Sequence, residues 1–186
     1  MRRHDAIKTV ANCFKEGYII GCNGLISREL FDLGDSARNF YVLGSMGLPT
    51  AIGLGLSLAR PDKRIVVITG DGNQLMSLGT LATIGKVSPK NFVEVVLDNE
   101  CYETTGGQET SSSSTNFSDL ARISGFRYSA YVDSLDRLSS ELARSLKTKG
   151  PILIHAKIDK DRTCPTRTEI NPRKVKERFM KAVAAN

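Results

Sequence analysis

The strongest indication of the fold comes from the stretch Arg64-Ile-Val-Val-Ile-Thr-Gly-Asp-Gly-Asn73. Its first six residues form an apolar run typical of a buried strand, and the Gly-Asp-Gly-Asn sequence follows directly. A second apolar run, Phe92 to Leu97, leads to Asn99. The interval fits a strand, a helix and a second strand, and strands connected in this way lie parallel. The stretch therefore predicts an α/β fold in which Asp71 and Asn99 meet at one carboxyl edge of a sheet.

The same alternation of strand and helix patterns continues along the rest of the chain. Helices are expected at 5–15, 27–30, 48–59, 74–85, 117–123 and 135–146, and strands at 18–22, 40–43, 64–69, 92–97, 128–132 and 152–158. Asn171-Pro172 predicts the start of a last helix. We expect a doubly wound parallel sheet flanked by helices, in a single domain over residues 1–186.

One long segment, 100–116, is expected to be irregular. It begins directly after Asn99 and contains Gly106-Gly107 and the serine run 111–114. Long loops in compact domains are usually functional or disordered. The segment is therefore interpreted as an active-site flap, with a plain mobile linker as the alternative.

The side chains expected at the sheet edge suit a metal-bound diphosphate. Asp71 and Asn99 offer hard oxygen ligands to Mg²⁺, and glycines let the backbone approach phosphate closely. A calcium loop is excluded, because no ladder of Asp or Asn and no Glu follow at the required offsets. An Asx turn that caps a helix is the structural alternative.

Composition and charge exclude several other classes of protein. The net charge is +6, but the densest basic group, 173–181, is expected on a terminal helix as a solvated face, and no nucleic-acid-binding motif is present. The longest weakly polar stretch, 48–59, is too short for a bilayer, which needs roughly twenty residues. The amino terminus lacks the apolar core of a signal peptide, so a cytoplasmic location without membrane contact is expected.

Cysteine and histidine offer no strong site of their own. The four cysteines, at 13, 22, 101 and 164, stand singly, without a C-x-x-C pair, and free thiols are expected. His155 lies within an apolar run and is expected to be a packed strand residue. His4 is expected to be exposed.

Five runs, one of them within the stretch 64–73, resemble a known family over nearly the whole chain. They are Gly44-Ser-Met-Gly47, Ile52 to Pro61, Gly70-Asp-Gly72, Pro89-Lys-Asn-Phe92 and Gly106-Gly-Gln-Glu-Thr110. The chain resembles the thiamine diphosphate-binding subunits of the sulfopyruvate decarboxylase family, which are related to the phosphonopyruvate decarboxylases. It departs at Cys101, where many relatives have a small residue, and at Glu109, where they usually have Pro.

The resemblance implies a cofactor site for thiamine diphosphate and Mg²⁺. Asp71, Asn99 and the Cys101 backbone carbonyl would hold the metal. The Gly44 carbonyl would receive the pyrimidine amino group, and Met46 would lie under the bent cofactor, unless it is ordinary core packing. The implied cofactor-binding residues are Gly44, Ser45, Met46, Gly70, Asp71, Gly72, Asn73, Asn99, Cys101 and Tyr102.

The resemblance also implies that this chain is half of an enzyme. In the family, a glutamate on a separate pyrimidine-binding domain activates the cofactor, and too few residues precede Gly44 to form such a domain. A pyrimidine-binding α-subunit would supply it, in a hetero-oligomer that could be α2β2 or larger. The expected substrate is an anionic 2-oxoacid, either 3-sulfopyruvate or 3-phosphonopyruvate.

Several residues are candidates for contact with that substrate. Glu103 and Gln108 are the candidate catalytic residues, and Thr110 could also face the substrate. Arg28 could bind a sulfonate or phosphonate, or form a surface ion pair. Two alternative functions remain open, a carboligase subunit of acetolactate synthase type and a non-catalytic ligand-binding or regulatory subunit.

Overall fold

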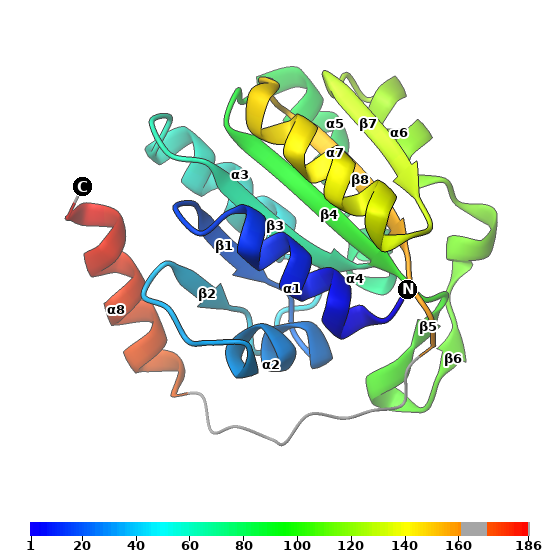
Figure 1. The fold of residues 1–186 in the computed structure, drawn as a ribbon, viewed down its shortest axis with the longest axis horizontal. Coiled ribbons are helices and arrows are strands. Elements are labelled where there is room, and N and C mark those ends of the chain that lie inside the picture. Colours follow the sequence, from blue (N-terminus) through cyan, green and yellow to red (C-terminus); the bar gives the residue numbers. More distant parts are fainter. Residues whose placement is uncertain (161–170, 186) are drawn as a thin grey trace.

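The computed structural model describes residues 1–160 and 171–185, and its centre is a six-stranded parallel sheet (Figure 1). The strand order is β2-β1-β3-β4-β8-β7. The strands are β1 (Tyr18–Gly21), β2 (Asn39–Tyr41), β3 (Ile65–Gly70), β4 (Phe92–Asp98), β7 (Tyr128–Val132) and β8 (Ile152–Lys157).

Helices cover both faces of this sheet. The apolar clusters place α1 (Arg3–Cys13), α2 (Leu25–Asp32) and α7 (Leu135–Lys147) on one face. They place α3 (Pro49–Ala59), α5 (Leu78–Val87) and α6 (Phe117–Ile123) on the other face (Figure 1). The short helix α4 (Asp71–Met76) follows β3, and α8 (Pro172–Ala184) contacts β2 at the sheet edge. The predicted doubly wound fold is confirmed.

The central strands are apolar because both of their faces are covered. In β3, Val66 and Ile68 belong to the cluster under α1 and α7, whereas Val67 belongs to the cluster under α3 and α5. Strands buried on two sides carry nearly continuous apolar runs instead of alternating ones. This is why the two runs that flank the Gly-Asp-Gly sequence predict the middle of the sheet.

The helix expected at 74–85 is in fact two helices, and that prediction is wrong in detail. The first, α4, begins at Asp71, directly after β3, and the chain leaves helical geometry at Ser77. The Ser77 hydroxyl donates to the carbonyl of Asn73 at 3.2 Å. Serine can satisfy backbone groups in this way outside a regular helix. The break leaves α4 as a separate short element at the carboxyl edge of the sheet.

The segment 100–116, expected to be irregular, carries regular structure. Strands β5 (Cys101–Tyr102) and β6 (Gln108–Glu109) form an antiparallel hairpin around the 3-10 turn η1 (Glu103–Thr105). A second 3-10 turn, η2 (Ser111–Ser114), contains the serine run. Ser112 in this turn is buried. The segment is therefore folded against the carboxyl edge of the sheet.

The predictions for the last helix and for the cysteines are confirmed in the part of the chain that the structure describes. The Asn171 side chain accepts a hydrogen bond from the Lys174 amide at 3.1 Å, as expected of an N-cap. Cys13, Cys22 and Cys101 are free thiols, whereas Cys164 lies outside the described residues. Among the described residues, no helix has both the length and the apolar character needed to cross a bilayer.

Candidate functional site

The candidate site lies at the carboxyl ends of β1 and β3. The chain runs outward from β1 to β2 and then returns to β3 on the other side of β1 (Figure 1). Open α/β sheets bind ligands at such a switch point. A cavity of about 110 Å³ opens here. Its walls include Arg3, Met46, residues 22–26, residues 70–73, Asn99 and residues 101–105.

Asp71 is a buried carboxylate without a cationic partner among the described residues. Its Oδ2 accepts hydrogen bonds from the hydroxyls of Thr110 at 2.5 Å and Ser112 at 3.3 Å. Burial raises the pKa of Asp71, and the nearby charge of Asp98 raises it further. A buried carboxylate that lacks a cation loses free energy of solvation. A metal ion at this position would stabilise the ionised form.

Asn99 lies at the cavity on a tight turn that follows β4. Its Oδ1 accepts a hydrogen bond from the Cys101 amide at 3.1 Å, and Glu100 between them has a φ of 60°. This Asx-type turn brings Asn99 and Cys101 to the cavity wall together. Burial raises the pKa of the Cys101 thiol, which favours its neutral form.

Next to Asn99, Asp98 forms a polar network with β8 that sequence analysis did not identify. Asp98 Oδ2 lies 2.9 Å from His155 Nε2, and Oδ1 accepts a hydrogen bond from the Ser112 hydroxyl at 2.7 Å. Burial opposes ionisation of Asp98, but these hydrogen bonds more than compensate, and its pKa is lowered. His155 is packed between the rings of Phe117 and Tyr131, as predicted for a buried strand residue.

The loop 44–47 is attached to α4 by a direct hydrogen bond. The Gly47 amide donates to Asn73 Oδ1 at 2.9 Å. Ser45 and Gly47 both have positive φ, of 50° and 89°, so the loop turns sharply before α3. Met46 thereby reaches the cavity beside residues 70–73.

At Gly72, helix α4 lies close to β5 and to the loop 44–47. A Cβ at this position would lie 2.4 Å from Cε1 of Tyr102 and 3.0 Å from Cε of Met46. Only glycine leaves room for both side chains beside α4. Gly72 is itself buried, so the glycine lets Tyr102 and Met46 pack directly against the backbone of the Gly-Asp-Gly sequence at the cavity wall.

The structure brings most of the predicted site residues together, but not all of them. Met46, Gly70, Asp71, Gly72, Asn73, Asn99, Cys101, Tyr102 and Glu103 line one cavity, whereas Gly44, Ser45, Gln108, Thr110 and Arg28 do not. Gln108 is exposed and bonds to Thr105 within the hairpin. Thr110 is buried, but its hydroxyl is directed at Asp71.

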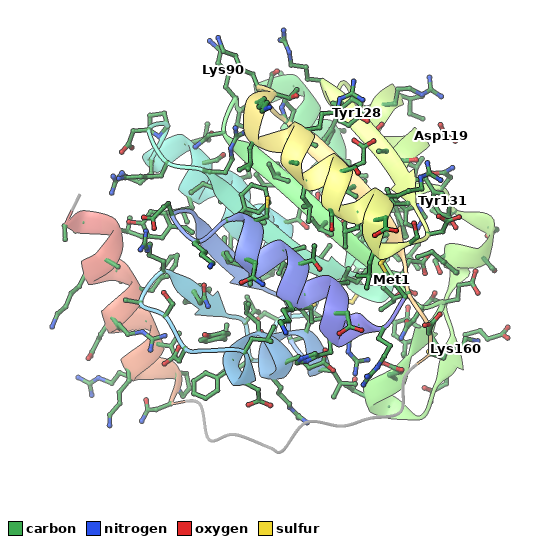
Figure 2. The ribbon with its side chains drawn as sticks, viewed as in Figure 1. Met1, Lys90, Asp119, Tyr128, Tyr131 and Lys160 are labelled. Carbon is green, nitrogen blue, oxygen red and sulfur yellow. The ribbon has the colours of Figure 1, made fainter. Side chains whose placement is uncertain are left out.

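Arg3 lines the candidate site, a position that the sequence did not predict. It is 2% exposed and lines the cavity, where it forms ion pairs with Glu29 and Glu103. The amino terminus lies beside the end of β8, as the position of Met1 in Figure 2 shows, and Met1 forms an ion pair with Asp159 at 3.3 Å. No local pattern predicts these contacts, because they join residues 26 to 158 positions apart.

The donor set at the cavity fits Mg²⁺ together with a diphosphate. No group of three His, Cys, Asp or Glu side chains within residues 1–160 and 171–185 is arranged to hold a metal. The expected set uses one carboxylate, one amide oxygen and one backbone carbonyl, which are the hard ligands that Mg²⁺ accepts alongside phosphate oxygens. The buried carboxylate of Asp71, which has no cationic partner among the described residues, and the position of Gly72 at the cavity wall agree with such a ligand.

Comparison with known proteins defines the class of this fold and site. Residues 20–156 match the family described as thiamine pyrophosphate enzyme, C-terminal TPP binding domain. A solved structure from Mycobacterium smegmatis, described as a candidate thiamin diphosphate-dependent enzyme, superposes with a TM-score of 0.75 at 22% identity. The superposition covers 87% of this chain and 32% of the Mycobacterium smegmatis chain. At this sequence identity the likeness supports the fold alone. The chain belongs to the thiamine diphosphate-binding domain family.

Closer relatives define the particular subfamily. The chain is 40% identical to sulfopyruvate decarboxylase subunit beta of Methanocaldococcus jannaschii, over 98% of this chain and 97% of that one. It is 41% identical to phosphonopyruvate decarboxylase of Streptomyces viridochromogenes, over 81% of this chain but only 38% of the relative. The chain therefore belongs to the sulfopyruvate decarboxylase β-subunit family, whose members are thiamine diphosphate-binding subunits of a carboxy-lyase.

Proposed function

We propose that this chain, with a partner subunit, decarboxylates 3-sulfopyruvate or 3-phosphonopyruvate to the corresponding aldehyde and CO₂. The observation that carries this proposal is the meeting of Asp71, Gly72, Asn73 and Asn99 at one cavity, with Asp71 buried and lacking a described cationic partner. In this proposal Mg²⁺ is held by Asp71, Asn99 and the Cys101 carbonyl. The names of the two relatives support the choice of substrates.

When bound, thiamine diphosphate supplies a carbon nucleophile and an electron sink. The residues of this chain would hold and orient it. The backbone at Gly72 and the side chain of Asn73 would hold the diphosphate, and Met46, a flexible and polarizable side chain, would support the cofactor from the cavity wall. Glu103 is the candidate acid or base, and Gln108 would need movement of the hairpin to take part.

The partner would be the pyrimidine-binding α-subunit that supplies the activating glutamate. An exposed apolar surface adjoins the cavity and is the face that we assign to this subunit. Leu48 and Met76, which are 50% and 62% exposed, line it together. A groove of about 400 Å³ runs between α3 and α5 on this surface, and Met46 lines both the groove and the cavity. Large exposed apolar patches mark sites of protein association.

Co-expression with a candidate α-subunit tests the proposal. The purified complex should form aldehyde from sulfopyruvate or phosphonopyruvate, at rates on the order of 1 per second or more, and the isolated chain should not. Turnover by the chain alone would overturn the half-site assignment. Joining of two oxoacids would indicate a carboligase, and cofactor binding without turnover would indicate a regulatory subunit.

A pair of variants tests the assigned face separately. Met76→Asp should weaken co-purification of the partner, because it places a charge on the exposed apolar lining of the groove. Ile123→Asp is the matched control, since Ile123 is 70% exposed but lies on α6, away from the cavity. Equal co-purification of the two variants would contradict the assignment of this face.

A further inference from the structure

Arg3 is placed to act on a ligand in the cavity. Of the described side chains that line the cavity, it is the single cationic one, and Asp71 and Glu103 are the acidic ones. It belongs to the first turn of α1 and is almost fully buried. A guanidinium in such a position is a strong donor, because surrounding water competes little for its N–H groups.

The guanidinium of Arg3 is bonded to helix α2 on one side and to the turn η1 on the other. Nε and Nη2 both donate to Glu29 Oε1, at 3.0 and 2.7 Å, and Glu29 is a buried residue of α2. Nη1 donates to Glu103 Oε2. The pair of bonds to a regular helix fixes the orientation of the guanidinium, so that Nη1 is directed at the cavity wall formed by η1.

Glu103 is held less firmly than Glu29. It lies in the three-residue turn η1, followed by two exposed glycines with positive φ, Gly106 and Gly107. Its second oxygen, Oε1, is buried and has no hydrogen-bond partner within residues 1–160 and 171–185. A short turn flanked by glycines can change conformation at lower cost than a helix that packs on the sheet.

The substrates of the proposed function contain two anionic groups. The carboxylate leaves as CO₂, but the sulfonate or phosphonate stays throughout the reaction and must be bound in the cavity. A guanidinium is well suited to oxygens of this kind. Glu103 presents the same chemistry, an anionic oxygen, to the side of Arg3 that faces the cavity. The two anions would therefore compete for one position.

We propose that Arg3 binds the sulfonate or phosphonate of the substrate, and that Glu103 occupies this position on Arg3 until the substrate replaces it. The inference rests on the proposed function for the identity of the substrate. Arg3 is then a specificity-determining residue, and Arg28, which lies outside the cavity, is not. Release from Arg3 frees the Glu103 carboxylate at the cavity wall as the substrate arrives.

Calorimetric titration with 3-sulfopropionate tests the proposal, since this probe keeps the sulfonate but lacks the reactive 2-oxo group. The full chain is loaded with thiamine diphosphate and Mg²⁺, and propionate is titrated in parallel. Arg3→Lys should weaken binding of 3-sulfopropionate by about ten- to a hundredfold, the worth of a lost charged hydrogen bond. Glu103→Gln should strengthen it, because the competing charge is removed.

Glu109→Gln is the matched control, because it removes an exposed negative charge from the same hairpin. An equal gain in affinity for Glu109→Gln and Glu103→Gln would mean general electrostatic attraction and would overturn the proposal. Absence of saturable binding of 3-sulfopropionate would overturn it too. If Arg3→Lys fails to fold, the comparison of Glu103→Gln with Glu109→Gln still tests the proposal.

Kinetic measurements on the complex separate this inference from the proposed function. If the complex decarboxylates sulfopyruvate and Arg3→Lys leaves the KM ratio of sulfopyruvate to pyruvate unchanged, the function stands and the inference fails. If no 2-oxoacid turns over but the probe binds with the expected dependence on Arg3 and Glu103, the anion site stands and the assigned reaction fails.

Discussion

Glu94 provides a quantitative test of the energetics of this fold. It lies in the middle of β4 with no exposed surface, between Val67 of β3 and Leu153 of β8. Its Oε1 accepts a hydrogen bond from the Thr50 hydroxyl at 2.5 Å, and its Oε2 has no hydrogen-bond partner in the described part of the chain. Burial raises the pKa of Glu94 from 4.5 to about 7, against the opposing effect of the bond from Thr50.

This difference in pKa sets the direction and the size of the change in folding stability with pH. Below pH 4.5 the carboxyl is protonated in both the folded and the unfolded chain, so its full contribution to stability is present. As pH rises from 4.5 to 7, the unfolded chain ionises first and stability falls. A shift of 2.5 pKa units, at about 1.4 kcal/mol per unit, amounts to about 3 kcal/mol lost by pH 8. This is a large part of the stability of an ordinary domain.

Glu94→Gln keeps the shape of the neutral acid but cannot ionise. The free energy of unfolding, measured by urea titration between pH 4 and pH 8, should therefore rise for the variant relative to the natural chain by about 3 kcal/mol across this range. Glu177→Gln, an exposed position on α8, controls for the substitution itself. A stability difference that stays constant with pH would refute the assignment of Glu94 as a buried neutral acid.

Three further outcomes are expected. Asp71→Ala should abolish binding of thiamine diphosphate in calorimetry, and EDTA should do the same to the natural chain; unchanged affinity in EDTA would contradict the metal assignment. Gly85→Ala should lower the free energy of unfolding by about 3 kcal/mol in urea titration, because the new Cβ would lie 1.6 Å from the Ser124 carbonyl oxygen. Gly79→Ala on the same helix is the control: its new Cβ has no described atom within 4 Å, and the free energy of unfolding should rise by up to about 1 kcal/mol. Hydrogen exchange in 100–116 should slow when thiamine diphosphate and Mg²⁺ are added with a partner, and shortening the serine run should lower turnover more than cofactor affinity; equally strong protection with and without cofactor would mean a rigid hairpin and no flap.

Segment 100–116 shows which features could be predicted from the sequence and which could not. Its glycines and serines indicate a loop, and nothing local indicates that Ser112 would be buried between Asp71 and Asp98. These hydrogen bonds depend on the sheet, which brings the ends of β3 and β4 beside each other. The burial of Ser112 could not be predicted, because its partners are supplied by the fold and not by neighbouring residues. The hairpin itself is local, but strands β5 and β6 have two residues each and are too short to show an alternating pattern.

The parallel sheet and its ligand-binding edge could both be predicted from the amino-acid sequence. Apolar runs that alternate with helix patterns can bury their side chains only in a covered sheet, and the positions of Asp71 and Asn99 at the ends of two such runs follow from connectivity alone. The tertiary structure decided which other residues join that edge. Arg3 with Glu103 and Thr50 with Glu94 are separated by 100 and 44 residues, and only the packing of α1 and α3 on the sheet brings each pair together, because side-chain contacts form where elements meet in space.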